Sequence, residues 1–167
     1  RGVGPSRNTA IENACGELFA FLDSDDLWMP QYLETMIRAF ETSETDIVYS
    51  AVQYFDSNTR EPLIIWGPTP EDLKEFPTPL YQRNFIAPSG ALIRASATKK
   101  IGPFDANPLI QSCEDHDYWL RAVELGLKFT FVPERYCLYR KNSGNQATDN
   151  YARILERDLR VLSKHKN

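Results

Sequence analysis

An apolar segment that runs directly into three carboxylates is the feature that most constrains this fold. Residues Leu18 to Leu22 are typical of a buried strand, and Asp23, Asp25 and Asp26 follow at once. At an effective dielectric of about 20, two carboxylates roughly 4 Å apart repel by about 4 kcal/mol, so the cluster favours a nearby cation. Alternation along an extended chain predicts Asp23 and Asp25 on one side and Asp26 on the other.

This acidic segment has two interpretations. Mg²⁺ and Mn²⁺ take oxygen ligands, often one or two carboxylates, with phosphates and waters in the remaining positions. An Asp-x-Asp turn at a strand end therefore indicates a metal site that leaves room for an anionic ligand. The alternative is a solvated acidic turn before a helix that begins near Pro30, and the short motif alone does not decide between the two.

Helical and extended patterns alternate along the chain, which predicts an α/β sheet. The predicted helices lie at residues 6–14, 30–42, 70–76, 114–125 and 151–162, and the remaining strands at 46–52, 90–94, 128–132 and 136–139. Apolar faces are expected at Tyr32, Leu33, Met36, Ile37 and Phe40, and at Tyr151, Ile154, Leu155, Leu159 and Leu162. The segment 57–88 holds six of the eleven prolines and is predicted to be an irregular surface insertion that covers a site.

Composition excludes several classes of protein. A net charge of −4 and a pI near 5.2 argue against a nucleic-acid-binding or membrane-surface protein, because both use a basic surface. Three cysteines without metal-ligand spacing favour a reduced compartment and packing roles. No apolar run approaches the roughly 20 residues of a membrane span, and no signal peptide is visible.

A second acidic cluster begins the predicted helix at residue 114. Glu114, Asp115 and Asp117 lie in its first turn, where carboxylates stabilise a helix through its dipole and its free amides. One carboxylate is enough to stabilise the helix start, but this site has three beside a long loop. A general base needs a position of this kind, within reach of an incoming hydroxyl. His116 is expected to be an exposed helix residue.

Together these motifs resemble the family 2 glycosyltransferases, which have the GT-A fold. The resemblance rests on residues 4–8, 10–11, 14–17, 21–26, 28–30, 102–105, 114–115, 117 and 119–121. It implies a Rossmann-like α/β domain, with a mixed sheet flanked by helices, over residues 1–167, with residues 148–167 as a C-terminal helix. The family's first strands, which hold the nucleobase, precede the matching part, so we expect an N-terminally truncated fragment whose activity alone is doubtful.

The resemblance also implies roles for the acidic residues. In that family the Asp-x-Asp turn holds Mn²⁺ or Mg²⁺ on the donor diphosphate, which makes Asp25 the direct metal ligand. Asp23 would lie near the metal or the ribose, and Asp26 would bind substrate or orient its neighbours. Asp115 matches the catalytic base, and Glu114 would position it or bind the acceptor.

Two arginines and one asparagine complete the implied site. Arg7 and Arg140 are expected to meet phosphate, since a guanidinium can bind phosphate bidentately. Many relatives carry a histidine shortly after the second arginine, where Asn142 stands here. A third protein ligand to the metal is therefore not predicted.

The leading hypothesis is an inverting, metal-dependent transfer of a single sugar from a nucleotide-sugar to a saccharide or lipid-linked hydroxyl acceptor. It implies a cytoplasmic role in polysaccharide or glycoconjugate synthesis, with the parent protein at the inner membrane face. A degenerate, noncatalytic domain that binds carbohydrate or a partner protein is the alternative, and nucleotidyl transfer is a third. Trp66, Tyr81 and Phe85 would form either a sugar-stacking surface or part of the core.

Overall fold

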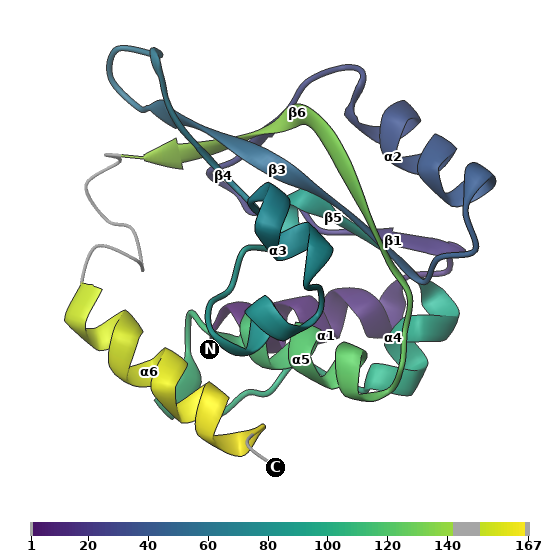
Figure 1. Ribbon diagram of the computed structural model, residues 1–167, viewed down its shortest axis with the longest axis vertical. Helices are drawn as coiled ribbons and strands as arrows, with labels where there is room; N and C mark the ends of the chain where they lie inside the picture. Colours follow the sequence, from purple (N-terminus) through teal and green to yellow (C-terminus); the bar gives the residue numbers. More distant parts are fainter. Residues whose placement is uncertain (1, 142–150, 166–167) are drawn as a thin grey trace.

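The computed structural model describes residues 2–141 and 151–165 and forms a mixed sheet with helices on both faces (Figure 1). In this part of the chain the sheet has six strands: β1 Leu18–Ala20, β2 Leu27–Trp28, β3 Ile47–Asp56, β4 Pro62–Trp66, β5 Ala91–Arg94 and β6 Phe129–Lys141. The strand order is β1-β5-β3-β6-β2, and β4 pairs with β3. The β3–β6 pair is parallel and the other pairs are antiparallel, so the sheet is mixed as predicted.

The helices separate into two layers. They are α1 Val3–Asn13, α2 Tyr32–Thr42, α3 Pro70–Lys74, α4 Ala95–Ile101, α5 Glu114–Glu124 and α6 Tyr151–Lys164, with 3-10 turns at Thr78–Tyr81, Pro88–Gly90 and Pro108–Ile110. Helices α1, α4 and α5 lie on one side of the sheet and α2 on the other (Figure 1). Helix α6 packs against α5 and the turn at Pro108–Ile110.

The central strand β3 separates two hydrophobic cores. Ile47 and Tyr49 face the core that contains Trp119 of α5, whereas Val48 and Val52 face the core under α2. Successive side chains of a strand point to opposite faces, and both faces here are covered. This double burial is why the segment is continuously apolar in sequence.

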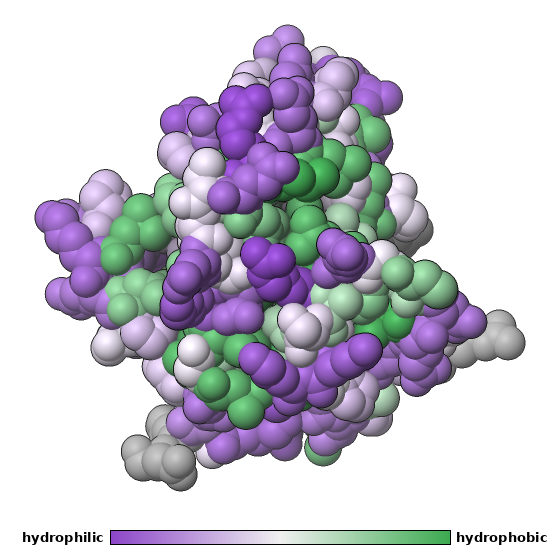
Figure 2. All heavy atoms as spheres, turned by 90° about the vertical axis from the view of Figure 1, so that its right-hand side faces the viewer, coloured by the Kyte–Doolittle hydropathy of each residue, from purple (hydrophilic) through white to green (hydrophobic). Residues whose placement is uncertain are grey.

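Helix α2 buries a narrower stripe than its sequence predicts. Tyr32, Met36 and Phe40 are buried, but Leu33 and Ile37 are 42% and 39% exposed. Figure 2 views the molecule from the α2 side of Figure 1 and shows apolar patches between polar ones on this face. The side chains of Leu33 and Ile37 therefore lie at the edge of the core and are not enclosed by it.

The segment 57–88 is more regular than predicted. It contains β4, which extends the sheet beside the second half of β3, and the helix α3, which begins with Thr69 as its cap. Pro62 is tolerated because proline is compatible with the first residue of an edge strand. The two predicted strands at 128–132 and 136–139 form one strand, β6, which passes through Pro133 where the β3–β6 register shifts.

Two helices differ from their predicted form. Helix α1 begins at Val3, so Ser6 is an internal residue whose hydroxyl donates to the Gly2 carbonyl at 3.0 Å. In α6 the predicted apolar face is only partly confirmed: Ile154 and Leu162 pack against the core, whereas Tyr151, Leu155 and Leu159 are exposed and Val161 is buried instead. Polar contacts of α6 with α5, described below, set its rotation. Within the described ranges no helix is both long and apolar enough to cross a membrane.

Candidate active site

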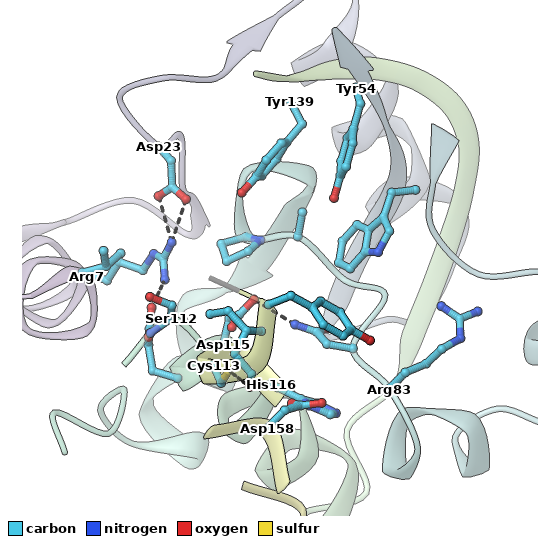
Figure 3. Close-up of a pocket in the computed structure, with 18 residues that line it drawn as sticks. Arg7, Asp23, Tyr54, Arg83, Ser112, Cys113, Asp115, His116, Tyr139 and Asp158 are labelled. Atoms are coloured by element: carbon cyan, nitrogen blue, oxygen red, sulfur yellow. Dashed lines mark hydrogen bonds and ion pairs between the residues drawn. The ribbon is translucent and has the colours of Figure 1, made fainter. Parts of the chain in front are cut away.

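A cavity of about 470 Å³ opens between the acidic turn, the far halves of β3 and β6, and the start of α5. Arg7 and Asp23 lie on one side of it, Tyr54 and Tyr139 lie above, and Asp115 lies below them (Figure 3). The cavity therefore contains three predicted substrate-binding residues, Arg7, Asp23 and Glu114, and the predicted base. Asp25, Asp26 and Arg140 are not among its described lining residues.

Arg7 joins the two acidic clusters. Its Nη2 donates to both oxygens of Asp23 at 2.8 and 2.9 Å, and its Nη1 donates to Oε1 of Glu114 at 2.9 Å. The Arg7 side chain is only 8% exposed. Burial opposes the charge, but the surrounding carboxylates outweigh it and raise the pKa of Arg7. Glu114 also accepts the Ser112 amide at 2.6 Å, so this pair fixes the acidic turn against the start of α5.

The acidic segment is a tight turn. The amide of Asp26 donates to the Asp23 carbonyl at 3.0 Å, so the extended geometry assumed for this segment does not hold, because β1 ends at Ala20. Asp26 is buried, and burial raises its pKa to about 6. Arg140 holds the turn from β6: its amide donates to Oδ1 of Asp26 at 3.2 Å, and its Nε donates to the Asp25 carbonyl at 2.7 Å.

The metal ligands stay a prediction. In the described part of the chain, no group of three or more His, Cys, Asp or Glu side chains is arranged to hold a metal ion. Asp23 and Asp25 remain as a carboxylate pair, and each carboxylate oxygen has more than one lone pair. Asn142, which stands where relatives carry a histidine, lies outside the described residues.

Asp115 is the second residue of α5 and lies half-buried at the cavity wall. Burial and the charge of Glu114 raise the pKa of Asp115 to about 6. Its Oδ2 accepts a hydrogen bond from Nδ2 of Asn84 at 2.9 Å. The N-cap residue of α5 is Cys113, and its side chain makes no capping hydrogen bond. The acidic residues of this turn therefore do not act as the N-cap.

Asp117 and His116 have structural partners on α6 and α5. Asp117 is buried, and it accepts from Arg121 at 2.9 Å and from Lys164 of α6 at 2.5 Å. The expectation that His116 is exposed is wrong, because it is fully buried. Its Nδ1 lies 2.5 Å from Oδ1 of Asp158 and its Nε2 lies 2.6 Å from the Leu80 carbonyl.

Both neighbours of His116 are acceptors, so both ring nitrogens donate only in the imidazolium form. Burial opposes this charge, but the hydrogen bond and charge of Asp158 outweigh it and raise the pKa of His116. The pair positions α6 so that Tyr151, Ile154 and Asp158 line the cavity. No local pattern in the sequence indicates this contact, because Asp158 lies in a later helix.

Aromatic rings form the cavity wall beside Asp115. The rings of Tyr54 and Tyr139 stack with their centroids 4.9 Å apart. The ring centroids of Trp66 and Tyr54 are 6.5 Å apart. The hydroxyls of both tyrosines point into the cavity (Figure 3). Of the three predicted aromatic residues, Trp66 lines the cavity, whereas Phe85 is fully buried and Tyr81 packs against the core.

The cysteines are free in the described structure. Cys113 and Cys137 are buried, which confirms a packing role for them, whereas Cys15 is exposed.

Comparison with known proteins places this chain in a family. The model of glycosyl transferase family 2 matches residues 1–102, so the chain belongs to that family. An uncharacterized glycosyltransferase of Methanocaldococcus jannaschii, MJ1057, is 29% identical over 140 residues, which cover 83% of this chain and 47% of the relative. The Escherichia coli UDP-Glc:alpha-D-GlcNAc-diphosphoundecaprenol beta-1,3-glucosyltransferase WfaP is 27% identical over 159 residues, which cover 93% of this chain and 58% of WfaP.

The same architecture occurs in a solved structure. The chain is similar to S. aureus TarS 1–349 in complex with UDP-GlcNAc, with a TM-score of 0.70 and 20% identity over 98% of this chain and 46% of the TarS chain. This similarity and the mixed sheet flanked by helices confirm the predicted GT-A fold class. The chain spans about half the length of the relatives it matches.

Proposed function

We propose that this chain contributes the catalytic centre of a transferase that moves a sugar from a nucleotide-sugar to a hydroxyl of a saccharide acceptor, with inversion at the anomeric carbon. The observation that carries the proposal is the position of Asp115, which lines the same cavity as Asp23 of the acidic turn and the aromatic wall. Membership of glycosyl transferase family 2 supports this assignment. The named donors of WfaP and TarS, UDP-Glc and UDP-GlcNAc, support a nucleotide-sugar donor.

Asp115 would act as the general base. Its pKa of about 6 leaves it ionised near neutral pH but still basic enough to accept a proton. It takes the proton of the acceptor hydroxyl while that oxygen bonds to the anomeric carbon. The bond from this carbon to the donor phosphate breaks, and the nucleoside diphosphate leaves with the electron pair. One displacement of this kind inverts the configuration.

The acidic turn fits a divalent cation held in part by the donor. Mg²⁺ and Mn²⁺ sites commonly use one or two carboxylates together with substrate phosphates, and the turn offers Asp25 and Asp23. We assign Asp25 as the direct ligand, because both oxygens of Asp23 already accept from Arg7. When bound, the cation would neutralise charge on the leaving diphosphate. Arg7 and Arg140 would add positive charge on the same side.

The aromatic wall favours a saccharide as the acceptor. Trp66 offers an apolar ring surface, and the hydroxyls of Tyr54 and Tyr139 offer hydrogen bonds within the same cavity. WfaP is named for a sugar acceptor linked to diphosphoundecaprenol. By analogy, we propose a lipid-linked saccharide acceptor and a cytoplasmic site of action at the inner face of the membrane, in glycoconjugate or polysaccharide synthesis.

Transfer from UDP-Glc and UDP-GlcNAc to saccharide acceptors tests this function, with Asp115→Asn as the variant. We expect turnover to fall at least a hundredfold, in the range of a general base, while donor binding is retained. Equal turnover by the variant would overturn the mechanism. Saccharide binding without turnover in the unmodified protein would instead indicate either the noncatalytic alternative or a fragment that is inactive alone.

A further inference from the structure

The loop between the turns Thr78–Tyr81 and Pro88–Gly90 carries a side chain that contacts Asp115 directly. Nδ2 of Asn84 donates to Oδ2 of Asp115 at 2.9 Å, and Asn84 itself lines the cavity. A hydrogen bond to an ionised group is roughly twice as strong as a neutral one. Asn84 therefore contacts the group to which the proposed function gives the central chemical step.

The orientation of the Asn84 amide is fixed by its other end. Oδ1 of Asn84 accepts the backbone amide of Ile86 at 3.0 Å. If the amide were flipped, its NH₂ would face the Ile86 N–H, and its oxygen would face the Asp115 carboxylate. Donor would then meet donor and acceptor would meet acceptor, so only the observed orientation satisfies both partners.

The loop itself is held firmly against α5. Nε1 of Trp119 donates to the Ile86 carbonyl at 2.9 Å, and both Trp119 and Phe85 are fully buried. Trp119 and Asp115 both belong to α5. The same helix therefore holds the loop that carries Asn84 and the carboxylate that Asn84 contacts. The distance between Asn84 and Asp115 is thus set by the core of the protein.

Two features act against an ionised Asp115, and Asn84 opposes both. Burial and the neighbouring Glu114 raise the pKa of Asp115 to about 6, although the charges of Arg7 and His116 and the His116 amide act to lower it. A donor on the carboxylate favours the charged form and lowers the pKa. Because the bond engages Oδ2, it also fixes the carboxylate plane and makes Oδ1 the oxygen available to a substrate hydroxyl.

We infer that Asn84 is a positioning residue for Asp115: it orients the carboxylate, stabilises its ionised form and reserves Oδ1 for the acceptor hydroxyl. The catalytic meaning rests on the proposed function, whereas the effect on Asp115 itself does not. The segment 57–88 therefore reaches the reacting group as well as the acceptor side of the cavity.

A carbon-13 NMR titration of the aspartate carboxyl groups tests this inference without any activity. The Asp115 resonance is assigned by its loss in Asp115→Asn. We expect Asn84→Ala to raise the pKa of Asp115 by about one unit, since a hydrogen bond to a charged group is worth about that much. The control Asn58→Ala, in the exposed β3–β4 turn, leaves it unchanged. An unchanged titration in a folded Asn84→Ala protein overturns the inference.

A second variant covers the case in which Asn84→Ala does not fold. Asn84→Asp keeps the oxygen that accepts from Ile86, but it replaces the donor with a carboxylate. We expect the apparent pKa of the pair formed by this new carboxylate and Asp115 to rise further, because two adjacent carboxylates disfavour double ionisation. If the apparent pKa in Asn84→Asp equals the pKa of Asp115 in the unmodified protein, the contact between residues 84 and 115 is contradicted.

The pH dependence of turnover separates a positioning role from a structural one. If the pKa rises by one unit, kcat/KM of Asn84→Ala falls about fivefold at pH 6 from ionisation alone, and this part of the loss disappears by pH 8. A structural defect lowers kcat/KM by the same factor at every pH and overturns the positioning role. A shifted NMR titration in a protein that transfers no sugar supports the contact, whatever the outcome for the proposed function.

Discussion

Nη1 of Arg7 lies 2.9 Å from Oε1 of Glu114, so the guanidinium that binds the acidic turn also binds the first residue of α5. Glu114 and Arg7 are 5% and 8% exposed at their side chains, which makes this a buried ion pair. Removal of one partner of such a pair leaves an uncompensated buried charge. We therefore expect the packing of the acidic turn against the start of α5 to depend on Arg7.

Replacement of Arg7 by methionine should destabilise the fold strongly. We expect the free energy of unfolding to fall by about 3–5 kcal/mol, because the Glu114 carboxylate would stay buried without its cation. Urea unfolding measures the change. The control is Arg38→Met on α2, where the pair with Glu34 is 68% and 73% exposed and should contribute about 0.5 kcal/mol or less. Similar losses in the two variants would contradict a special role for the Arg7 bridge.

Asp25→Asn should abolish metal-dependent binding of the nucleotide. With Mn²⁺ and a nucleoside diphosphate at 100 times the dissociation constant, binding should stabilise the unmodified protein by about 2.7 kcal/mol. Thermal unfolding with and without EDTA measures this gain. The isosteric control Glu44→Gln removes a carboxylate that is 94% exposed, and it should keep the full gain. A metal-dependent gain that persists in Asp25→Asn would show that the cation is held elsewhere.

The features that can be predicted from the sequence are those set by local pattern. The first half of strand β3 is predictable because both of its faces are buried, which makes that half mostly apolar. Asp115 and Asp23 stand out because they belong to short motifs at the ends of regular elements. Strand β4 escapes prediction because it lies at the sheet edge, where Ile64 is 62% exposed, and because nearby prolines suggest irregular structure.

The features that escape sequence analysis depend on contacts between distant segments. Tyr54 and Tyr139 stack because β3 and β6 pair in one particular register, and neither strand reveals that register alone. Asn84 meets Asp115 only because the loop is packed onto α5. Each of these contacts is decided by tertiary packing, which local periodicity does not encode.

Trp66→Ala should weaken acceptor binding and leave donor binding intact. The ring lines the cavity beside the two tyrosines, so its loss removes apolar contact with a saccharide. We expect the KM for the acceptor to rise about tenfold, which corresponds to about 1.4 kcal/mol. Trp66→Phe keeps a ring and should recover most of the affinity. An unchanged acceptor KM in Trp66→Ala would place the acceptor elsewhere.

The buried His116–Asp158 pair should make stability depend on pH above neutrality. Burial disfavours the charged ring, but Asp158 and the Leu80 carbonyl outweigh that effect and raise the pKa of His116 above its usual value near 6.5. When the folded pKa lies above the unfolded one, the stabilisation is complete below the unfolded pKa. It is lost as pH rises through the folded pKa.

We therefore expect the free energy of unfolding to decrease between pH 7 and pH 9 in the unmodified protein. Asp26 and Asp115, with pKa values of about 6, titrate mostly below this window. Burial raises the pKa of the Cys113 and Cys137 thiols, so at about pH 8.5 they ionise only in the unfolded chain and add to the decrease at the upper end of the window. Urea unfolding of His116→Gln over the same range isolates the histidine. The variant should be less stable than the unmodified protein at pH 7, and the difference should shrink by pH 9. A difference that stays constant with pH would mean that the neutral ring makes the same contacts, and that α6 docks without the charge.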